Sequence, residues 1–321
     1  MLTNPTEALS TNERTGVPTF WCPMLRRPCR RLAAGMALIA VSWWGSWSGE
    51  NWLAQHAFLP LWIGYITTLD AISELRSGTS LWARGKLQFS ALFLVSIPFW
   101  WLFEAFNARL GNWSYDFPHH YSWLAYHLDS SLSFSIVVPA IFVTAELFRA
   151  FGFPGRAGHW LTIRPGKAGW LLFALGGIAM VALVLASPNI FFPLVWVGLF
   201  FAIDPIVRLM SGWSIAAQVE RGWWAGVLRL FAAGITCGFF WEMWNWRAMP
   251  KWTYEIPNME WAHLFEMPIL GYGGYLPFAL ETYAIVMVVN RVLRIWPDEY
   301  FVFDRPDASE VAKVATEVPG A

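Results

Sequence analysis

The sequence predicts an all-α integral membrane protein with about eight transmembrane helices, arranged as two parallel four-helix repeats. The first observation behind this prediction is composition: 56% of the 321 residues are hydrophobic and only 14% are charged. In soluble domains, about 45–50% of the residues are apolar and about 25% are charged. The formal net charge is zero, so no basic excess exists to neutralise phosphates, and we expect no nucleic-acid partner. The partner that this composition indicates is the lipid bilayer.

The second observation is a set of apolar segments that approach the length of about 20 residues that a membrane span needs. The segment 168–186 contains no charged residue at all. The first, second and fourth segments are short enough to be tilted or re-entrant. The segments are Leu32–Trp47, Phe58–Ala71, Leu87–Phe106, Leu132–Phe148, Ala168–Ala186, Ile190–Met210, Trp223–Trp246 and Ile269–Val289.

The distribution of Lys and Arg predicts the orientation, because these residues concentrate in cytoplasmic loops. With an even number of spans, only Arg109, Arg247 and Lys251 fall on the side opposite the termini. We therefore expect a multi-pass protein of the cell membrane with both termini in the cytoplasm. The long loops 107–130 and 246–268 should face outward.

The third observation is an internal duplication. Residues 62–80 and 196–214 share Trp, Gly, Asp, Ile, Leu and Ser-Gly-x-Ser at matching positions without a gap. The stretch FEAFNAR at 103–109 then matches WEMWNWR at 241–247, and a Trp-x-Tyr-x-x-Pro motif follows both. Each copy holds four predicted spans, so both copies enter the membrane from the same side. The repeats should be parallel, related by a pseudo-twofold axis along the membrane normal.

The duplication divides the chain into four parts. A cytoplasmic N-terminal segment covers 1–31, and the first four-helix repeat covers 32–150. The second repeat covers 151–296. We expect 297–321 to be a disordered cytoplasmic tail, because it is charged and contains Pro.

Two carboxylates at matching positions of the duplication are the main functional candidates. A carboxylate inside a span costs about 2.5–3.5 kcal/mol on insertion scales, so it needs a partner or a purpose. Glu104 and Asn107 lie three residues apart and share a helix face, as do Glu242 and Asn245. One hypothesis is a neutral buried carboxyl that delivers a proton. The alternative is a structural clasp, in which the arginine that follows in each copy pairs with the carboxylate.

Aromatic residues of the outer loops are candidates for binding a substrate. The repeated motif places Trp113 and Tyr115 in one loop, and Trp252 and Tyr254 in the other. One interpretation is an interfacial hairpin whose rings lie at headgroup level. The other is a lid over an apolar cavity, with the two tyrosines as hydrogen-bond donors.

The second copy alone carries the unusual stretch EMPILGYGGYLPFALE at 266–281. Its glycines permit close helix contact or an unwound turn, and Tyr272 and Tyr275 are expected on one face. Glu281 lies near the middle of its predicted span. Because the first copy lacks this stretch, the second copy is the better candidate for an active half.

Other polar clusters have a structural interpretation. Asp70 and Asp204 each precede a Ser-Gly pair that is typical of a helix stop, and Asp204 has Arg208 four residues on as a helical ion-pair partner. Three histidines of the first outer loop fit no helical metal motif and are interpreted as solvated, with a metal site as the alternative. We expect no metal and no other cofactor.

The second copy also distantly resembles the lycopene cyclase domain, a family built from tandem membrane repeats. The shared order is an acidic residue in a span, Trp-x-Tyr in the next loop, and a Pro with a following acid in the next span. Glu242, Trp252, Tyr254, Pro277 and Glu281 fill these places, although the Glu-Glu pair of that family is absent. The resemblance implies an intramembrane carboxylic acid that protonates an isoprenoid double bond, as in related carotenoid hydratases and membrane terpene cyclases.

Together, these observations predict a membrane enzyme that cyclises, hydrates or isomerises a hydrophobic, isoprenoid or carotenoid-like lipid. The predicted general acid is Glu242, with Glu281 assisting and Glu104 as a third candidate. A transporter or channel for a small solute or lipid is the alternative, and a non-catalytic membrane scaffold is a third possibility. The predicted substrate-binding residues are Asn107, Asn245, Tyr115, Tyr254, Trp252, Tyr272 and Tyr275.

Overall fold

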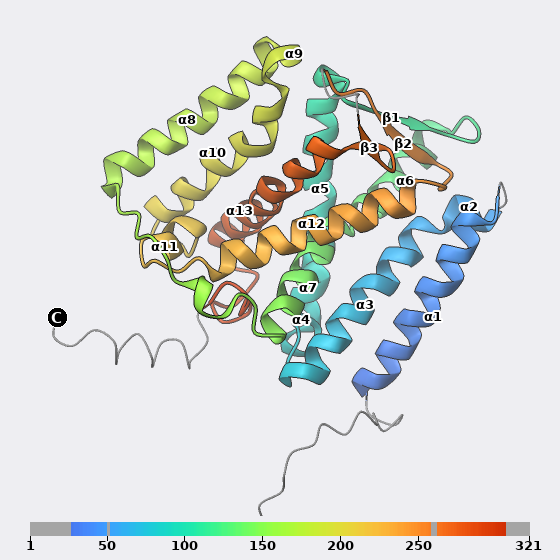
Figure 1. The fold of residues 1–321 in the computed structure, drawn as a ribbon, viewed down its shortest axis with the longest axis horizontal. Coiled ribbons are helices and arrows are strands. Elements are labelled where there is room, and N and C mark those ends of the chain that lie inside the picture. Colours follow the sequence, from blue (N-terminus) through green and yellow to red (C-terminus); the bar gives the residue numbers. More distant parts are fainter. Residues whose placement is uncertain (1–26, 50–51, 258–261, 306–321) are drawn as a thin grey trace, which may run out of the picture.

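Long helices packed side by side form the body of the molecule, and short strands gather at one end (Figure 1). The computed structural model describes residues 27–49, 52–257 and 262–305. Within these ranges, six helical segments are long and apolar enough to cross a membrane, which confirms the predicted class of an all-α, membrane-embedded protein. They are Lys86–Leu110, Trp123–Ala150, Gly166–Ala186, Pro188–Leu209, Ala225–Asn245 and Ile269–Leu293.

The elements run along the chain in two series of similar order. The first series comprises α1 (Arg27–Trp47), α2 (Trp52–His56), α3 (Phe58–Ser77), α4 (Leu81–Arg84), α5 (Lys86–Leu110), β1 (Trp113–Asp116), α6 (Trp123–Phe134) and α7 (Val137–Ala150). A 3-10 turn, η1 (Gly155–Gly158), follows. The second series comprises α8 (Gly166–Ala186), α9 (Pro188–Phe191), η2 (Phe192–Leu194), α10 (Val195–Leu209), α11 (Ile215–Val219), α12 (Ala225–Asn245), β2 (Lys251–Tyr254), β3 (His263–Leu264), β4 (Met267–Pro268), η3 (Ile269–Gly274) and α13 (Tyr275–Leu293).

Helix pairs on the two flanks enclose a central group. On one flank α1 packs along α3, and on the other α8 packs along α10. Between them, α7 contacts α3, α5 and α12, while α13 contacts α10 and α12. The α8–α10 pair is close because Gly177 has no side chain: a Cβ there would lie 2.2 Å from the backbone nitrogen of Ala202.

The two repeated aspartates organise the turns at the opposite end from the strands. Asp70 accepts hydrogen bonds from the Ser80 hydroxyl (2.9 Å) and the Trp82 N–H (3.1 Å), at the start of α4. Asp204 accepts the N–H groups of Ile215 (2.9 Å) and Ala216 (2.8 Å), at the start of α11. Each carboxylate thus satisfies donors that a helix start leaves free, so both aspartates have a structural role.

The ion pairs at this end differ from the one predicted from helix spacing. Arg208 does not pair with Asp204. Its Nε lies 2.7 Å from Glu220 instead, because the Asp204 oxygens are occupied by backbone donors. In the first series Arg31 of α1 supplies the missing cation, since it pairs with both Asp70 and Glu74.

Strands β1 and β2 pair with each other across the two series. β1 and β2 run antiparallel, with Trp113 opposite Tyr254 and Tyr115 opposite Trp252. From the sequence, the two Trp-x-Tyr motifs were expected in separate loops, and no pairing between them was predicted. This pairing brings the two Trp-x-Tyr motifs, far apart in the sequence, to one place above the helices (Figure 1).

The prediction of a disordered tail from residue 297 is wrong for residues 297–305. Tyr300, Phe301, Phe303 and Asp304 are buried, and the Tyr300 hydroxyl donates to the backbone oxygen of Leu81 at 2.9 Å. Aromatic side chains in a charged stretch can bury enough apolar area to order it. The rest of the predicted tail, and residues 1–26 of the predicted N-terminal segment, lie outside the described residues.

Candidate functional site

Glu242 lies near the end of α12, and its carboxyl is fully buried. The Tyr254 hydroxyl of β2 donates to Glu242 Oε1 at 2.7 Å, and the Tyr275 hydroxyl of α13 donates to the same oxygen at 2.6 Å. The Trp252 indole donates to the Tyr254 hydroxyl at 2.9 Å. Glu242 Oε2 has no hydrogen-bond partner among the described residues. The carboxyl is therefore held through one oxygen, and no Lys or Arg of the described residues forms an ion pair with it.

Glu104 occupies the matching position near the end of α5 and is held in a similar way. Its Oε1 accepts the Tyr115 hydroxyl at 2.5 Å, the Trp100 indole at 2.9 Å and the Trp113 indole at 3.2 Å. Unlike Glu242, this side chain is only partly buried. The two copies therefore present the same unit, a carboxyl held by a strand tyrosine, in two environments.

The hydrogen-bond donors to the two carboxyls differ because the two copies carry different residues at two aligned positions. Trp100 aligns with Gly238, and Val137 aligns with Tyr275. A Cβ on Gly238 would lie 2.3 Å from the Tyr275 ring, so the glycine creates the space in which Tyr275 rests on α12 and reaches Glu242. In the first copy the indole of Trp100 supplies a donor to the carboxyl instead.

The two predicted asparagines do not contact the carboxyls or the cavity. The Asn245 amide donates to the Trp252 carbonyl at 2.7 Å and accepts the Trp252 N–H at 2.9 Å. Asn107 makes the same pair of bonds to Trp113. An amide has one acceptor and a donor group, which match both backbone groups of one residue. These asparagines fix the strand tryptophans, so the prediction that they bind a substrate has no support in this geometry.

The arginine clasp proposed as an alternative is absent from these units. Arg247 lies over the rings of Trp47 and Trp246, and the Arg109 Nε donates to the Leu185 carbonyl at 3.1 Å. Neither guanidinium pairs with Glu104 or Glu242. Tyrosine and tryptophan donors take the place that the sequence suggested for arginine.

The tyrosines of both units line one aromatic cavity of about 660 Å³, within the size range of small-molecule sites. Strand residues of both series form part of its wall, and helix aromatics form the remainder. Glu104 and Glu242 lie directly behind this wall. The aromatic lining includes Trp100, Trp113, Tyr115, Trp196, Trp241, Trp252, Tyr254, Tyr275 and Phe278.

The strand tyrosines remain protonated near neutral pH. Burial raises the pKa of Tyr254 well above its usual value, and the charge of Glu242 raises it further. Burial and Glu104 act in the same direction on the pKa of Tyr115. Both hydroxyls can therefore donate a hydrogen bond to the carboxyl, or pass a proton between the carboxyl and the cavity.

Two other predicted residues lie outside this arrangement. Glu281 is fully buried six residues after Tyr275, about 9 Å along the helix, and does not line the cavity. It approaches the backbone of Leu199 and Phe200 without a hydrogen bond of standard geometry. The Tyr272 hydroxyl donates to the Leu264 carbonyl at 3.1 Å. The structure therefore does not bring Glu281 to Glu242, and Tyr272 supports the loop.

The outer histidines make aromatic contacts. His127 stacks on Trp101 with ring centroids 5.2 Å apart, and His119 stacks on Tyr121 at 4.5 Å. Within the described parts of the chain, no three His, Cys, Asp or Glu side chains gather closely enough to hold a metal ion.

Sequence reasoning missed several residues that shape the cavity. Trp196 and Phe278 line it with their rings 5.9 Å apart, and Trp241 lies 6.0 Å from Tyr275. Trp196 opens the repeated Trp-x-Gly motif and Trp241 precedes the repeated Glu, so both carried a signal in the duplication. Gly238 carried a signal only as the partner of Trp100 in the alignment.

Comparisons with protein-family models, curated proteins and solved structures give no match. The resemblance to the lycopene cyclase domain therefore stays a prediction.

Proposed function

We propose that this protein is a membrane enzyme that acts on a hydrophobic, isoprenoid-type lipid by general-acid chemistry in the aromatic cavity. One observation carries the proposal: tyrosines bonded to a fully buried carboxyl, Glu242, and to a partly buried one, Glu104, line a single apolar, aromatic cavity. A largely apolar cavity of this size suits a hydrocarbon chain. The carboxyl–tyrosine units place a proton source at its wall.

The proposed reaction begins with proton transfer to a carbon–carbon double bond. For this step the hydrogen bond between Tyr254 and Glu242 reverses, so that the protonated carboxyl donates to the Tyr254 oxygen. The Tyr254 hydroxyl, which lines the cavity, then gives its proton to one alkene carbon and receives the Glu242 proton. A C–H bond forms, the O–H bond of Glu242 breaks, and the other alkene carbon becomes a cation. Loss of a neighbouring proton to the carboxylate then gives an isomerised product. If a second double bond of the substrate first attacks the cation and forms a C–C bond, the same proton loss gives a cyclised product. If water adds to the cation instead, its extra proton passes to the carboxylate and the product is hydrated. Aromatic faces stabilise a cation by about 0.5–2 kcal/mol each.

Glu242 is the better proton source of the two carboxyls. It is fully buried and forms no ion pair with any described residue. It also has hydroxyl donors on two sides, Tyr254 and Tyr275, which both reach the cavity. Glu104 is partly exposed and bonded to two indoles, which cannot relay a proton.

We further propose that α1 and α3 are spans in addition to the six apolar segments, so that eight spans form two parallel four-helix repeats. Both helices have about the length that a span needs, with 21 and 20 residues. The matching order of the two series supports the repeat. The bias of Lys and Arg supports a cell-membrane protein with both termini in the cytoplasm.

Lipid analysis of a deletion strain tests the function. Cells without the gene should accumulate an unsaturated lipid precursor, and the wild-type gene should remove it. Glu242→Gln keeps the shape and the hydrogen-bond acceptor but supplies no acidic proton, so turnover should fall by about 10²–10⁴-fold. Tyr254→Phe should lower it as well, because the relay hydroxyl is lost.

Glu104→Gln is the matched control and should affect turnover much less. Thermal unfolding of each purified variant should stay near the wild-type value. An unchanged lipid composition in the deletion strain would contradict the enzyme proposal and favour the transporter. Full turnover by a folded Glu242→Gln protein would remove Glu242 as the acid.

A further inference from the structure

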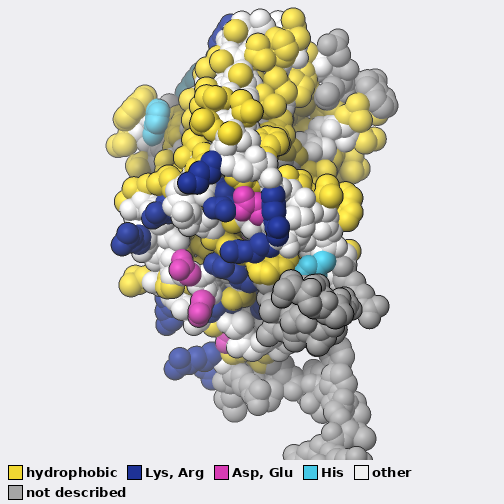
Figure 2. All heavy atoms as spheres, turned by 90° about the vertical axis from the view of Figure 1, so that its left-hand side faces the viewer, with side chains coloured by type: hydrophobic (Ala, Val, Ile, Leu, Met, Phe, Trp, Pro, Cys, Tyr) yellow, Lys and Arg dark blue, Asp and Glu magenta, His cyan; other side chains and the backbone are white. Residues whose placement is uncertain are grey.

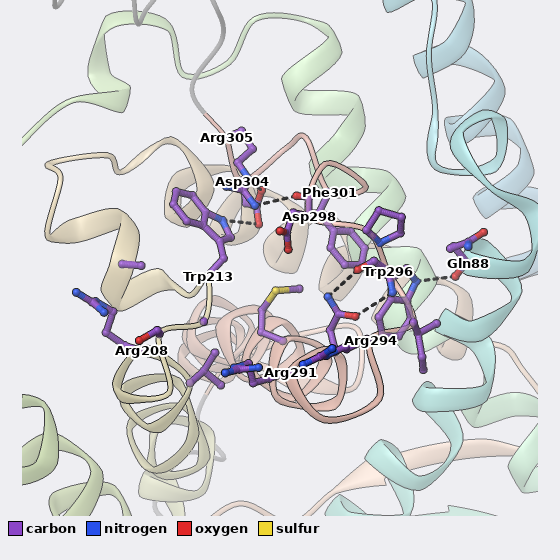
Figure 3. A pocket seen from close by; sticks show the side chains of 18 of the residues that line it. Gln88, Arg208, Trp213, Arg291, Arg294, Trp296, Asp298, Phe301, Asp304 and Arg305 are labelled. Atoms are coloured by element: carbon purple, nitrogen blue, oxygen red, sulfur yellow. Dashed lines mark hydrogen bonds and ion pairs between the residues drawn. The ribbon is translucent and has the colours of Figure 1, made fainter.

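A second cavity, of about 950 Å³, lies at the opposite ends of α10 and α13 from the aromatic cavity (Figure 3). Its wall is formed by the end of α10, α11, the end of α13 and the ordered tail 295–305. We call it the basic pocket. Its charged lining residues are Arg208, Glu220, Arg221, Arg291, Arg294, Asp298, Asp304 and Arg305.

Several of these charges are already satisfied within the protein. Arg208 pairs with Glu220 at 2.7 Å. Asp304 accepts the Trp213 indole at 3.0 Å and the Tyr283 hydroxyl at 2.6 Å. Arg305 lies over the Trp213 ring, 3.9 Å from its centroid. These groups build the wall and leave little charge to offer a ligand.

Arg291 and Arg294 are different. They lie three residues apart near the end of α13, on one side of the pocket (Figure 3). Among the described residues, Arg291 uses only its Nε, which donates to the Met210 carbonyl at 3.0 Å, and no acidic group pairs with it. The Arg294 side chain has no hydrogen bond or ion pair in the described parts of the chain, and the residue holds a positive φ of 53° where glycine is usual. Two guanidinium groups therefore face the pocket with donors to spare.

The pocket lies where the apolar helix segments end. Two candidate spans stop at Leu209 and Leu293, directly beside it. Figure 2 shows Lys and Arg gathered below a broad apolar region on this side of the molecule. Exposed apolar residues adjoin the pocket, among them Ile206, Met210 and Leu293. A ligand with a charged head and a hydrocarbon chain would find partners for both parts.

We propose that the basic pocket binds a phosphate group, with Arg291 and Arg294 as its cationic ligands. Guanidinium groups match phosphate oxygens with paired N–H donors, and basic pockets between spans on the cytoplasmic side bind anionic lipid headgroups. The phosphate belongs to a membrane lipid or to a soluble phosphate compound. This site is separate from the aromatic cavity, so it does not depend on the proposed reaction.

Ligand-induced thermal stabilisation of the full-length protein in a phosphate-free detergent tests the proposal. The probes are short-chain phosphatidylglycerol, short-chain phosphatidylcholine and inorganic pyrophosphate. Phosphatidylglycerol should raise the unfolding temperature of the wild type more than phosphatidylcholine does. Arg291→Gln/Arg294→Gln should weaken its apparent affinity by at least about tenfold, because two charge-assisted contacts are lost.

Arg27→Gln/Arg30→Gln is the matched control. It removes two exposed charges with the same spacing, at the same end of the molecule but on α1, and should leave the affinity within about twofold. Arg294→Gln alone, which removes no side-chain hydrogen bond or ion pair within the described residues, guards against a folding defect in the double variant. A response to pyrophosphate but not to phosphatidylglycerol would assign a soluble phosphate compound. No response to either probe, or an equal loss in the Arg27/Arg30 control, would overturn the proposal.

Discussion

At the residue scale, the two copies of the site hold equivalent carboxyls with different side chains. Trp100 donates to Glu104 from within its own helix, whereas Tyr275 donates to Glu242 from α13. Gly238 makes the second arrangement possible, because its Cα lies against the Tyr275 ring. A hydroxyl both donates and accepts, while an indole only donates. The exchange therefore gives the second copy alone two groups that can move a proton.

Asp304 provides a prediction about pH. Burial, opposed by Arg305 and by hydrogen bonds, raises the pKa of Asp304 to about 6, above its ordinary value near 4. The folded protein thus binds this proton more tightly than the unfolded chain does. The stability that Asp304 supports is complete below about pH 4 and is lost as the pH rises through 6, by about 3 kcal/mol in all.

Hydrogen exchange of residues 297–305 measures this effect. After correction for intrinsic exchange, protection in the wild type should fall between pH 5 and pH 7. Asp304→Asn cannot ionise and should flatten this dependence, whereas Asp298→Asn, at an exposed position, should keep it. The same pH dependence in wild type and Asp304→Asn would show that another group is responsible.

At the element scale, asparagines near helix ends set the path of the chain. Each binds both backbone groups of a tryptophan six or seven residues later, at the ends of α5, α12 and α13. The third case directs Trp296 into the ordered tail, with bonds of 2.8 and 3.0 Å. The first two direct the strand tryptophans toward the aromatic cavity. The pairs are Asn107–Trp113, Asn245–Trp252 and Asn290–Trp296.

Helix contact gives a second prediction. Gly177→Ala places a methyl group 2.2 Å from the backbone nitrogen of Ala202, so α8 must move away from α10, at a cost of about 1–3 kcal/mol. At the neighbouring Gly176, a Cβ meets nothing within 4 Å. Gly176→Ala should therefore be neutral or stabilising by up to about 1 kcal/mol. Thermal unfolding in detergent compares the two, and equal effects would refute the packing argument.

At the scale of the whole molecule, the β1–β2 pair joins the two series at one end, where the aromatic cavity lies, and the basic pocket lies at the other end. Each series contributes one strand and one carboxyl–tyrosine unit. Neither series alone encloses the cavity, because its wall includes residues of both.

A cross-link tests this joining of the two series. Ser114 lies opposite Thr253, and their hydroxyls are 3.2 Å apart. Directly opposed residues of antiparallel strands have Cα separations that a disulfide can bridge. Ser114→Cys/Thr253→Cys should therefore form a disulfide that keeps the two fragments together on a non-reducing gel after proteolysis between 151 and 165. Ser114→Cys/Lys251→Cys, which is out of register, should not, and equal cross-linking of both pairs would contradict the register.

Labelling of intact cells tests the proposed orientation. His120 and Glu299 are both exposed, at opposite ends of the molecule. With a membrane-impermeant thiol reagent, His120→Cys should react in intact cells and Glu299→Cys only after lysis, because the basic end should face the cytoplasm. The reverse result would invert the topology and leave the fold unchanged.

The sequence determined the properties that depend on local composition and on comparison within the chain. Apolar length predicted the membrane-embedded helical class, and six of the predicted segments coincide with the candidate spans. The duplication identified Glu104 and Glu242 as equivalent positions. It also identified the two Trp-x-Tyr motifs, whose tyrosines bond to these carboxyls. The count of eight spans stays a prediction, because α1 and α3 are not among the six helical segments that are long and apolar enough to cross a membrane.

Only the tertiary structure decided which groups meet. Helix spacing suggested Arg208 for Asp204 and an arginine or asparagine for Glu242, but backbone donors and tyrosines hold these carboxyls. Glu281 shares a helix with Tyr275 yet lies away from the cavity. The physical reason is that a contact between distant segments depends on the size and direction of several side chains at once. The bond between Tyr275 and Glu242 exists because Gly238 leaves room for it, and no single motif in the sequence contains all three residues.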